Sequence, residues 1–268
     1  MLEKVLACRR DAADYLAERW ARRFGAWPCV DRKYLLVGSE SSGTTAVADL
    51  LFKGHRELRY LEEGEQQWVW KAYREIYQGR ARLQDYARLR LFDAIKVPGF
   101  SVIIKEFLTE FPDSKVLYLI RDPRDFASSA IKTWKIKTMA EFGNIPWTNV
   151  EWLGVSSRNP VECLAMRWKV YFNAARQVKS VNFMKYETFC ADKVGTISAL
   201  SGQLDLVCNK ERVEAVCDQQ LSHSSVRAYR PSGPGAWRDS ILRVEDIATI
   251  ERVCGDEMQE CSYELATR

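Results

Sequence analysis

Short apolar runs alternate with helical stretches along most of the chain. The runs KYLLVG, SVIIK, KVLYLI and VNFMKY, at residues 33–38, 101–105, 115–120 and 181–186, have the length and apolar content of strands buried on both faces. Helical stretches separate these runs, as in repeated strand–helix–strand units. The pattern therefore predicts an α/β fold with a central parallel sheet between two helical layers, a three-layer sandwich.

Two further segments differ from this alternation. Residues 2–24 carry apolar side chains at helical spacing and predict an amphipathic helix within residues 1–30. Residues 132–160 lack a clean period and mix three tryptophans with glycine, asparagine and proline. This composition fits a lid or binding loop over the strand ends and fits an ordinary surface excursion equally well.

Composition and charge narrow the class of protein. With 268 residues, of which 47% are hydrophobic, the chain is expected to form one domain over residues 1–268. The net charge of +4 is small and dispersed, so nucleic acid is not expected as a partner, whereas a local anion pocket is compatible with it, and without an apolar span no membrane is expected either. Charges interrupt the N-terminal segment every few residues, which argues against a signal peptide or a membrane helix and favours a cytoplasmic protein.

Cysteine and histidine usage limits the available chemistry. The eight cysteines are widely spaced without a C-x-x-C pair, and the chain has only two histidines, so no metal site is expected. The same scarcity leaves little material for a histidine-based catalytic triad. Any general base is therefore expected to be a carboxylate.

A phosphate-type loop follows the first predicted strand. Residues 38–45 read GSESSGTT, with two glycines separated by four residues, and the apolar run AVADLLF follows. Such a strand-to-helix turn can present backbone N–H groups and a helix N-terminus to an anion. The lysine that contacts the β- and γ-phosphates in nucleotide triphosphatases is replaced by Thr44. The loop could therefore bind an anion other than a γ-phosphate, or simply cap a helix.

A second motif follows the predicted strand at 115–120. It reads RDPRDFASS, with Arg121 at the strand end, Pro123 near a helix start and Ser129 eight residues after the arginine. Arg121 and Ser129, two turns into the helix, could converge on one phosphate, the guanidinium as a charge-assisted fork and the hydroxyl as a further donor.

Together the two motifs resemble those of the sulfotransferases that use 3'-phosphoadenosine 5'-phosphosulfate (PAPS). In that family the first loop holds the 5'-phosphosulfate, and the arginine and serine hold the 3'-phosphate. Residues 183–187, FMKYE, resemble the family's Tyr-Glu motif near the adenine, and residues 230–238, RPSGPGAWR, resemble its glycine-rich loop. The resemblance implies a P-loop NTPase-like sulfotransferase fold, PAPS as donor, 3',5'-ADP (PAP) as product, and no metal. The residues it assigns to nucleotide binding are Ser39, Ser41, Ser42, Gly43, Thr44, Thr45, Arg121, Ser129, Tyr186, Arg230, Gly233, Trp237 and Arg238.

The catalytic assignments depend on two departures from the family pattern. The usual lysine or arginine before Ser-Gly-Thr is Ser41 here, and the Lys-Thr-His of the small-molecule branch is matched only by Lys105, which could supply the missing charge. Residues 59–64, RYLEEG, resemble a segment of the carbohydrate and protein-tyrosine branches in which a glutamate is the base. We therefore predict Glu63, then Glu62, as the base, although a solvated acidic turn would have the same sequence.

Three functions follow from these observations. The first is sulfuryl transfer to a hydroxyl or amine of a small molecule, sugar or peptide. The second is a small-molecule kinase on the same scaffold, against which the missing lysine argues. The third is a PAPS- or PAP-binding protein with impaired catalysis, which the serine at position 41 would favour. The sequence does not identify the acceptor or the oligomeric state.

Overall fold

The computed structural model describes residues 32–52, 55, 58–63, 67–143, 145, 151–155, 157–222 and 233–266. The helix predicted within residues 1–30 and the binding residue Arg230 lie outside these ranges, as does part of the segment 132–160. Of that segment, α6 (Met139–Gly143) and the 3-10 turn η5 (Glu151–Leu153) are described. Its role as a lid stays a prediction.

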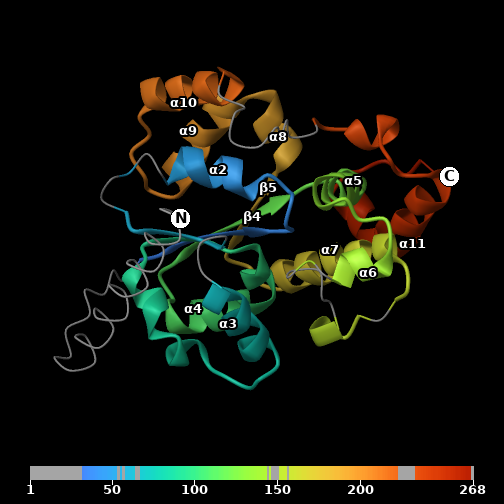
Figure 1. The fold of residues 1–268 in the computed structure, drawn as a ribbon. Coiled ribbons are helices and arrows are strands. Elements are labelled where there is room, and N and C mark those ends of the chain that lie inside the picture. The colour runs from blue at the N-terminus through green and yellow to red at the C-terminus, as the bar shows by residue number, and fades with distance from the viewer. Residues whose placement is uncertain are drawn as a thin grey trace, which may run out of the picture.

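The described residues contain a parallel five-stranded sheet with the order β2-β3-β1-β4-β5 (Figure 1). The strands are β1 (Tyr34–Gly38), β2 (Tyr60–Glu62), β3 (Ala94–Lys96), β4 (Lys115–Ile120) and β5 (Val181–Lys185). Three of the four predicted strands are confirmed as β1, β4 and β5. The α/β three-layer class is confirmed as well.

The fourth predicted strand, residues 101–105, is wrong. This segment is helical and comprises the end of η4 (Pro98–Ile103) and the start of α4 (Ile104–Glu110). A short apolar run reads alike in a buried strand and in a buried helix, and here the helix begins at a proline and is buried throughout η4. The Ser101 hydroxyl binds the backbone N–H and C=O of Gly38 at 3.2 and 3.3 Å, so η4 supports the end of β1. The strands that the sequence analysis missed, β2 and β3, have three residues each.

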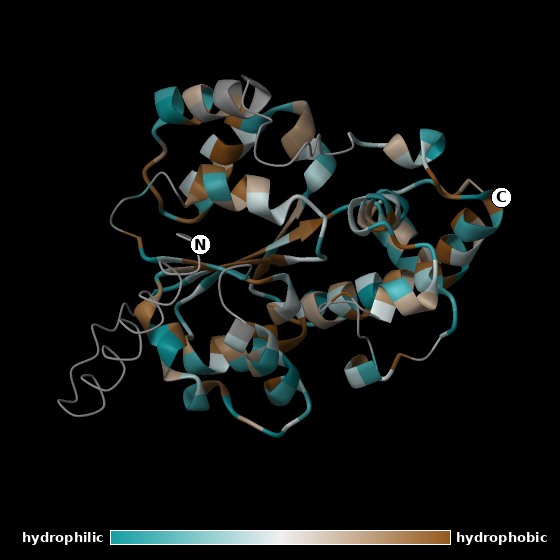
Figure 2. Cartoon of the chain, viewed as in Figure 1, coloured by the Kyte–Doolittle hydropathy of each residue, from teal (hydrophilic) through white to brown (hydrophobic). Residues whose placement is uncertain are grey.

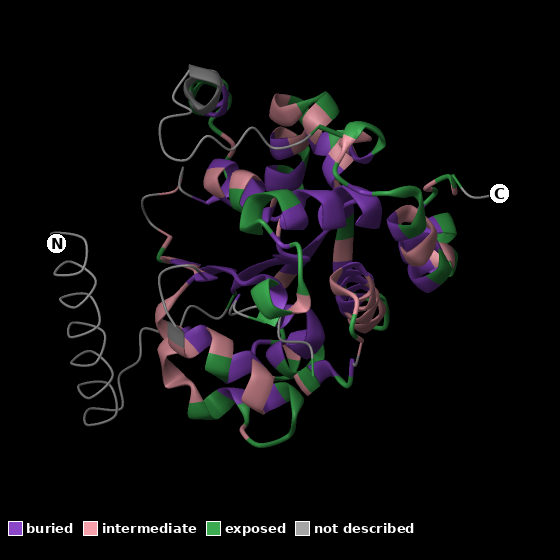
Figure 3. Cartoon of the chain, turned by 45° about the vertical axis from the view of Figure 1, so that its right-hand side comes forward, coloured by how far each residue is buried: buried purple, intermediate pink, exposed green. Residues whose placement is uncertain are grey.

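Alternating side chains of the strands pack into two separate cores. On one face, Tyr34 and Leu36 of β1 pack with α2 (Thr44–Leu51), α8 (Tyr186–Ala191), α9 (Lys193–Gln203) and α10 (Lys210–Ser222). On the other face, Leu35 and Val37 pack with η4, α3 (Gln67–Tyr77), α4, α5 (Pro123–Trp134), α7 (Pro160–Arg176) and α11 (Val244–Glu260). The three central strands β3, β1 and β4 are accordingly enclosed, whereas the edge strands β2 and β5 are only partly buried (Figures 2 and 3).

Local sequence explains where the helices that frame the site begin. The Asp122 side chain caps α5 by accepting a hydrogen bond from the Arg124 backbone N–H, and Pro123 occupies the first turn. Asn159 and Pro160 start α7 in the same way. The remaining described elements are the 3-10 turns η2 (Leu83–Asp85), η3 (Ala87–Leu91) and η6 (Ala236–Asp239). No helix within the described residues combines the length and apolar character that a membrane span requires.

Candidate functional site

The motifs identified in the sequence meet at the carboxyl edge of the sheet. In the order β2, β3, β1, β4, β5, the strand ends carry Glu62, Lys96, Gly38, Ile120 and Lys185. Parallel strands bring all these ends to one edge, so the loop at 38–45, Arg121 and Tyr186 lie on adjacent strand ends (Figure 1). This edge is where open α/β sheets bind ligands.

The loop at residues 38–45 depends on its two glycines. A Cβ at Gly38 would lie 2.5 Å from the Leu119 backbone oxygen, and one at Gly43 would lie 2.2 Å from the Tyr186 ring. Gly43 also has φ 88° and is the N-cap of α2. The Ser42 hydroxyl is buried and has no hydrogen-bond partner among the described residues. A buried, unpartnered hydroxyl beside a helix N-terminus is suited to an anionic ligand.

The remaining loop residues differ in exposure. Ser39 and Thr44 are buried, whereas Ser41 is half-buried and Thr45 is exposed. Ser41 adopts φ 62°, a left-handed conformation that turns the loop.

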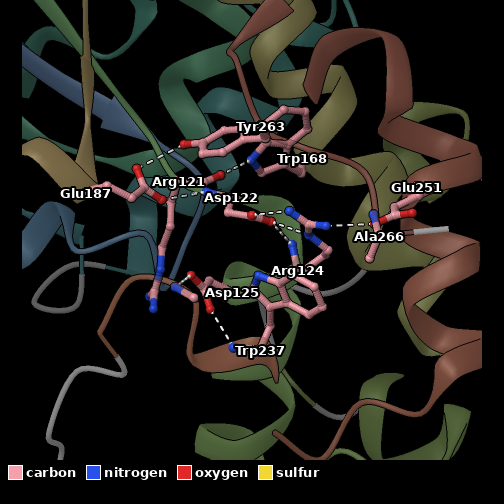
Figure 4. A network of polar contacts seen from close by, with 11 residues as sticks. Arg121, Asp122, Arg124, Asp125, Trp168, Glu187, Trp237, Glu251, Tyr263 and Ala266 are labelled. Carbon is pink, nitrogen blue, oxygen red and sulfur yellow. Dashed lines mark hydrogen bonds and ion pairs between the residues drawn. The ribbon is translucent and has the colours of Figure 1, made fainter. Parts of the chain in front are cut away.

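Arg121 links the second motif to this loop. Its side chain, only 1% exposed, donates a 2.7 Å hydrogen bond from Nη1 to the Ser41 carbonyl and lies over the Tyr186 ring at 4.8 Å. The Trp168 indole N–H donates to the Arg121 carbonyl at 3.0 Å (Figure 4). Ser129 is buried in α5, two turns beyond Asp122. The structure thus joins Arg121, Ser41 and Tyr186, which are far apart in the sequence.

The glycine-rich loop is docked on α5. The Asp125 carboxylate accepts hydrogen bonds from the backbone N–H groups of Gly235 and Trp237 at 2.7 and 2.8 Å (Figure 4). The Trp237 ring stacks on the Arg124 guanidinium at 4.0 Å, and exposed Arg238 lies 4.6 Å from the same ring. Burial raises the pKa of Asp125, and the two backbone donors oppose that shift. Gly233, also predicted to bind nucleotide, is exposed at the start of this loop.

Glu187 is a site residue whose role the sequence analysis missed. Its carboxylate accepts hydrogen bonds from the Asp122 backbone N–H at 3.1 Å and from the Tyr263 hydroxyl at 3.0 Å (Figure 4). The Tyr-Glu pair therefore has two functions, with Tyr186 against the first loop and Glu187 against the second motif. The family's Tyr-Glu motif is the signal in the sequence that could have pointed to Glu187. The sequence around Glu187 does not indicate its contact with Asp122, which is 65 residues away.

Two glutamates at the end of β2 have different surroundings. Glu62 lies 3.4 Å from the Lys96 ammonium. Glu63 is buried. Its burial is the larger cause, and the nearby Glu40 carboxylate the smaller one, of a pKa raised to about 8. Lys96 and Arg167 oppose the shift without cancelling it.

A buried ion pair that sequence reasoning did not anticipate anchors the loop at residues 38–45 to α7. Arg167 of α7, fully buried, donates to the two Glu40 carboxylate oxygens at 2.9 and 2.5 Å, and its neighbour Tyr171 also contacts this pair. Glu40 and Arg167 are 127 residues apart, so local pattern carries no signal for their contact. The pair ties the loop to the helix that carries Trp168.

The prediction that Lys105 stands at a strand end is wrong. Lys105 lies exposed on α4, because the segment that contains it is helical. The lysine that does end a strand beside β1 is Lys96, in the sequence AIKVP, and its side chain is buried next to Glu62. The strand is only three residues long, which explains why its apolar signal was weak.

These features define a class of protein: an α/β protein with a glycine-dependent strand-to-helix loop and a buried arginine at the carboxyl edge of a parallel sheet. A sequence comparison then identifies the family. The model of the Sulfotransferase family matches residues 54–209, more than half of the chain, and the chain therefore belongs to this family. A comparison with curated proteins found no match.

Solved sulfotransferase structures share the fold. Sulfotransferase STF9 from Mycobacterium avium superposes with a TM-score of 0.59 at 14% identity, covering 94% of this chain and 82% of that one. Mouse sulfotransferase SULT7A1, whose crystal structure is a complex with PAP, gives 0.57 at 15% identity and covers 85% of each chain. A sulfotransferase from Alicyclobacillus acidocaldarius gives 0.50 at 14% identity, covering 88% of this chain and 97% of that one. At these identities the likeness establishes the fold.

Proposed function

We propose that this protein transfers a sulfuryl group from PAPS to a hydroxyl or amine of a small-molecule, sugar or peptide acceptor. The observation that carries the proposal is the contact between Arg121 and Ser41, which joins the two motifs that would hold the two phosphate groups of one nucleotide. Family membership and the PAP complex of the mouse structure support the same donor.

The residues at the sheet edge fit such a donor. Backbone N–H groups at the start of α2 and the buried Ser42 hydroxyl would bind the 5'-phosphosulfate. Arg121 would bind the 3'-phosphate, because a guanidinium has five N–H donors, enough to bind a phosphate while keeping its bond to Ser41. Tyr186 holds the Arg121 guanidinium in place beneath the loop. The docked loop around Trp237 would cover the nucleotide from the side of α5.

Acceptor activation would fall to Glu63. In sulfuryl transfer a bond forms from the acceptor oxygen or nitrogen to sulfur, the bond from sulfur to the phosphate oxygen breaks, and the acceptor's proton needs a base. Glu62 is engaged by Lys96, whereas Glu63 has a pKa raised to about 8, which makes it a stronger base than an ordinary carboxylate once it is ionised. Lys96 in turn would stabilise charge on the departing phosphate, in place of the lysine absent at position 41.

Two measurements test this function. Thermal-shift titrations with 3',5'-ADP and with ATP plus magnesium separate a sulfotransferase from a kinase. Stabilisation by ATP plus magnesium but not by 3',5'-ADP would contradict the proposal. Transfer of radiolabelled sulfur from PAPS to a panel of phenols, amines, sugars and tyrosyl peptides then identifies the acceptor. Tight 3',5'-ADP binding with no transfer to any acceptor would point instead to a binding protein.

A further inference from the structure

A pocket lies against α3, the helix that follows the proposed base Glu63 along the chain. Its volume is about 410 Å³, a size suited to a small ligand, and it is open to solvent. The described residues that line it are Trp70, Lys71, Arg74, Glu75 and Arg80. Nothing in the donor site described above uses them.

The lining has an excess of positive charge. The lining contains three cationic side chains, those of Lys71, Arg74 and Arg80, and one carboxylate, that of Glu75. The Glu75 carboxylate accepts a hydrogen bond from the Tyr86 hydroxyl and lies 3.7 Å from the Lys71 ammonium. The Arg80 guanidinium donates to the neutral amide of Gln78. A pocket with this balance favours a ligand with a negative charge.

Trp70 is the aromatic residue of the described lining, and the lining residue Arg74 also packs against rings that do not line the pocket. The Arg74 guanidinium lies 5.8 Å from the Trp152 ring, which itself packs on Tyr73 and Tyr77 at 5.5 and 5.4 Å. Arg74 is thus held against a flat apolar surface. The Trp70 ring and the ordered Arg74 guanidinium together suit a flat ligand, such as an aryl group or a sugar ring, that carries an anionic substituent.

Trp70 connects the pocket with the proposed base. It lines the pocket, and its indole is one of the groups that act on the Glu63 carboxyl. We propose that this pocket binds the anionic end of the acceptor, so that the acceptor is a hydroxylated aryl or sugar compound bearing a carboxylate or similar anion. This inference rests on the proposed function, because it places the acceptor's hydroxyl toward Glu63.

Calorimetry with matched probes tests the proposal. The probe pairs are 4-hydroxyphenylacetate with its amide, and methyl glucuronide with methyl glucoside, each titrated with and without saturating 3',5'-ADP. In at least one pair the anionic member is expected to bind about tenfold more tightly, as a charge-assisted hydrogen bond would give. Equal affinities within both pairs, or no binding of either anionic probe, would overturn the proposal.

Variants assign the effect to the pocket. The double variant Lys71→Gln/Arg80→Gln removes two exposed charges of the lining and is expected to reduce the anionic preference to about twofold or less. Arg82→Gln, an exposed charge outside the lining, should keep the preference. An unchanged preference in the double variant would also overturn the proposal. Binding of 3',5'-ADP to the unmodified protein, measured in a separate titration, shows whether the donor assignment has failed instead.

Discussion

Glu63 illustrates how surroundings, more than residue type, set the chemistry of a side chain. Two glutamates are adjacent in the sequence, and the pattern RYLEEG treats them alike. In the fold, Glu62 is close to Lys96, whereas Glu63 is enclosed and lies near the Glu40 carboxylate. Burial and a like charge both favour the protonated form. These two effects are the physical basis for predicting Glu63, ahead of Glu62, as the general base.

The raised pKa of Glu63 predicts a particular dependence of stability on pH. The folded protein holds this proton up to about pH 8, whereas the unfolded chain releases it near the ordinary value of 4.5. Between these values the unfolded state binds fewer protons, so the free energy of unfolding falls as pH rises, by up to about 1.4 kcal/mol per pH unit from this group. Glu63→Gln removes the contribution and should become more stable relative to the unmodified protein from pH 5 to 8.

Urea denaturation at several pH values between 5 and 8 measures this difference, with Glu106→Gln on the exposed side of α4 as the matched control. A difference between the Glu63 variant and the unmodified protein that does not change with pH would contradict the assignment. If Glu63 is also the base, kcat/KM of the unmodified protein should rise with pH up to about 8.

At the scale of elements, the two motifs proposed to bind the nucleotide could be predicted from the sequence because each has a fixed local spacing. The loop at 38–45 and the motif beginning at Arg121 both follow strands of five or more residues, which give a clear apolar signal. Strands β2 and β3 are shorter, and the run at 101–105 is apolar because η4 is enclosed on all sides. The sequence therefore predicts Lys105 as the lysine that ends a strand, whereas in the structure the lysine that ends a strand beside β1 is Lys96.

The turn from β1 into α2 depends on Gly43. Gly43→Ala places a methyl group against the Tyr186 ring and forces a left-handed conformation on alanine, which costs at least about 1–2 kcal/mol. We expect this variant to lose stability and 3',5'-ADP affinity together, because the same turn forms the proposed anion site.

Gly202→Ala is the control for this substitution. Gly202 lies in α9 with open space around its Cα, so alanine should be neutral or stabilising by up to about 1 kcal/mol. Chemical denaturation and calorimetry compare the two variants. Full stability of Gly43→Ala would show that the loop does not need the close approach to Tyr186.

At the scale of the whole molecule, buried ion pairs connect the proposed donor site with distant parts of the chain. Arg167 joins Glu40 to α7, and Arg124 bridges Asp122 and Glu251, so α11 is tied to the start of α5 (Figure 4). Glu251 also accepts a hydrogen bond from the Ala266 backbone N–H at 2.8 Å. These partners are separated by up to 127 residues, and no local pattern could have predicted them.

The tie between α5 and α11 predicts a large stability effect far from the proposed chemistry. Glu251→Gln leaves the buried Arg124 with Asp122 as its carboxylate partner and weakens a charge-assisted hydrogen bond, so it should lower the free energy of unfolding by about 1.5–3 kcal/mol. Glu260→Gln, also on α11, breaks an exposed pair with Arg176 of α7 and should cost less than about 1 kcal/mol. Guanidinium denaturation of both variants makes the comparison, and equal small losses would mean that the buried pair does not couple the two helices.

The central claim is that Arg121 binds the 3'-phosphate of the donor nucleotide, and calorimetry with two nucleotides tests it most directly. Arg121→Ala should weaken binding of 3',5'-ADP by about 1.5–3 kcal/mol, and Ser129→Ala by less, because a charged hydrogen-bonding partner is lost. Binding of 5'-AMP, which lacks the 3'-phosphate, should change little in either variant. Equal losses for both nucleotides, or no loss for 3',5'-ADP, would contradict the account.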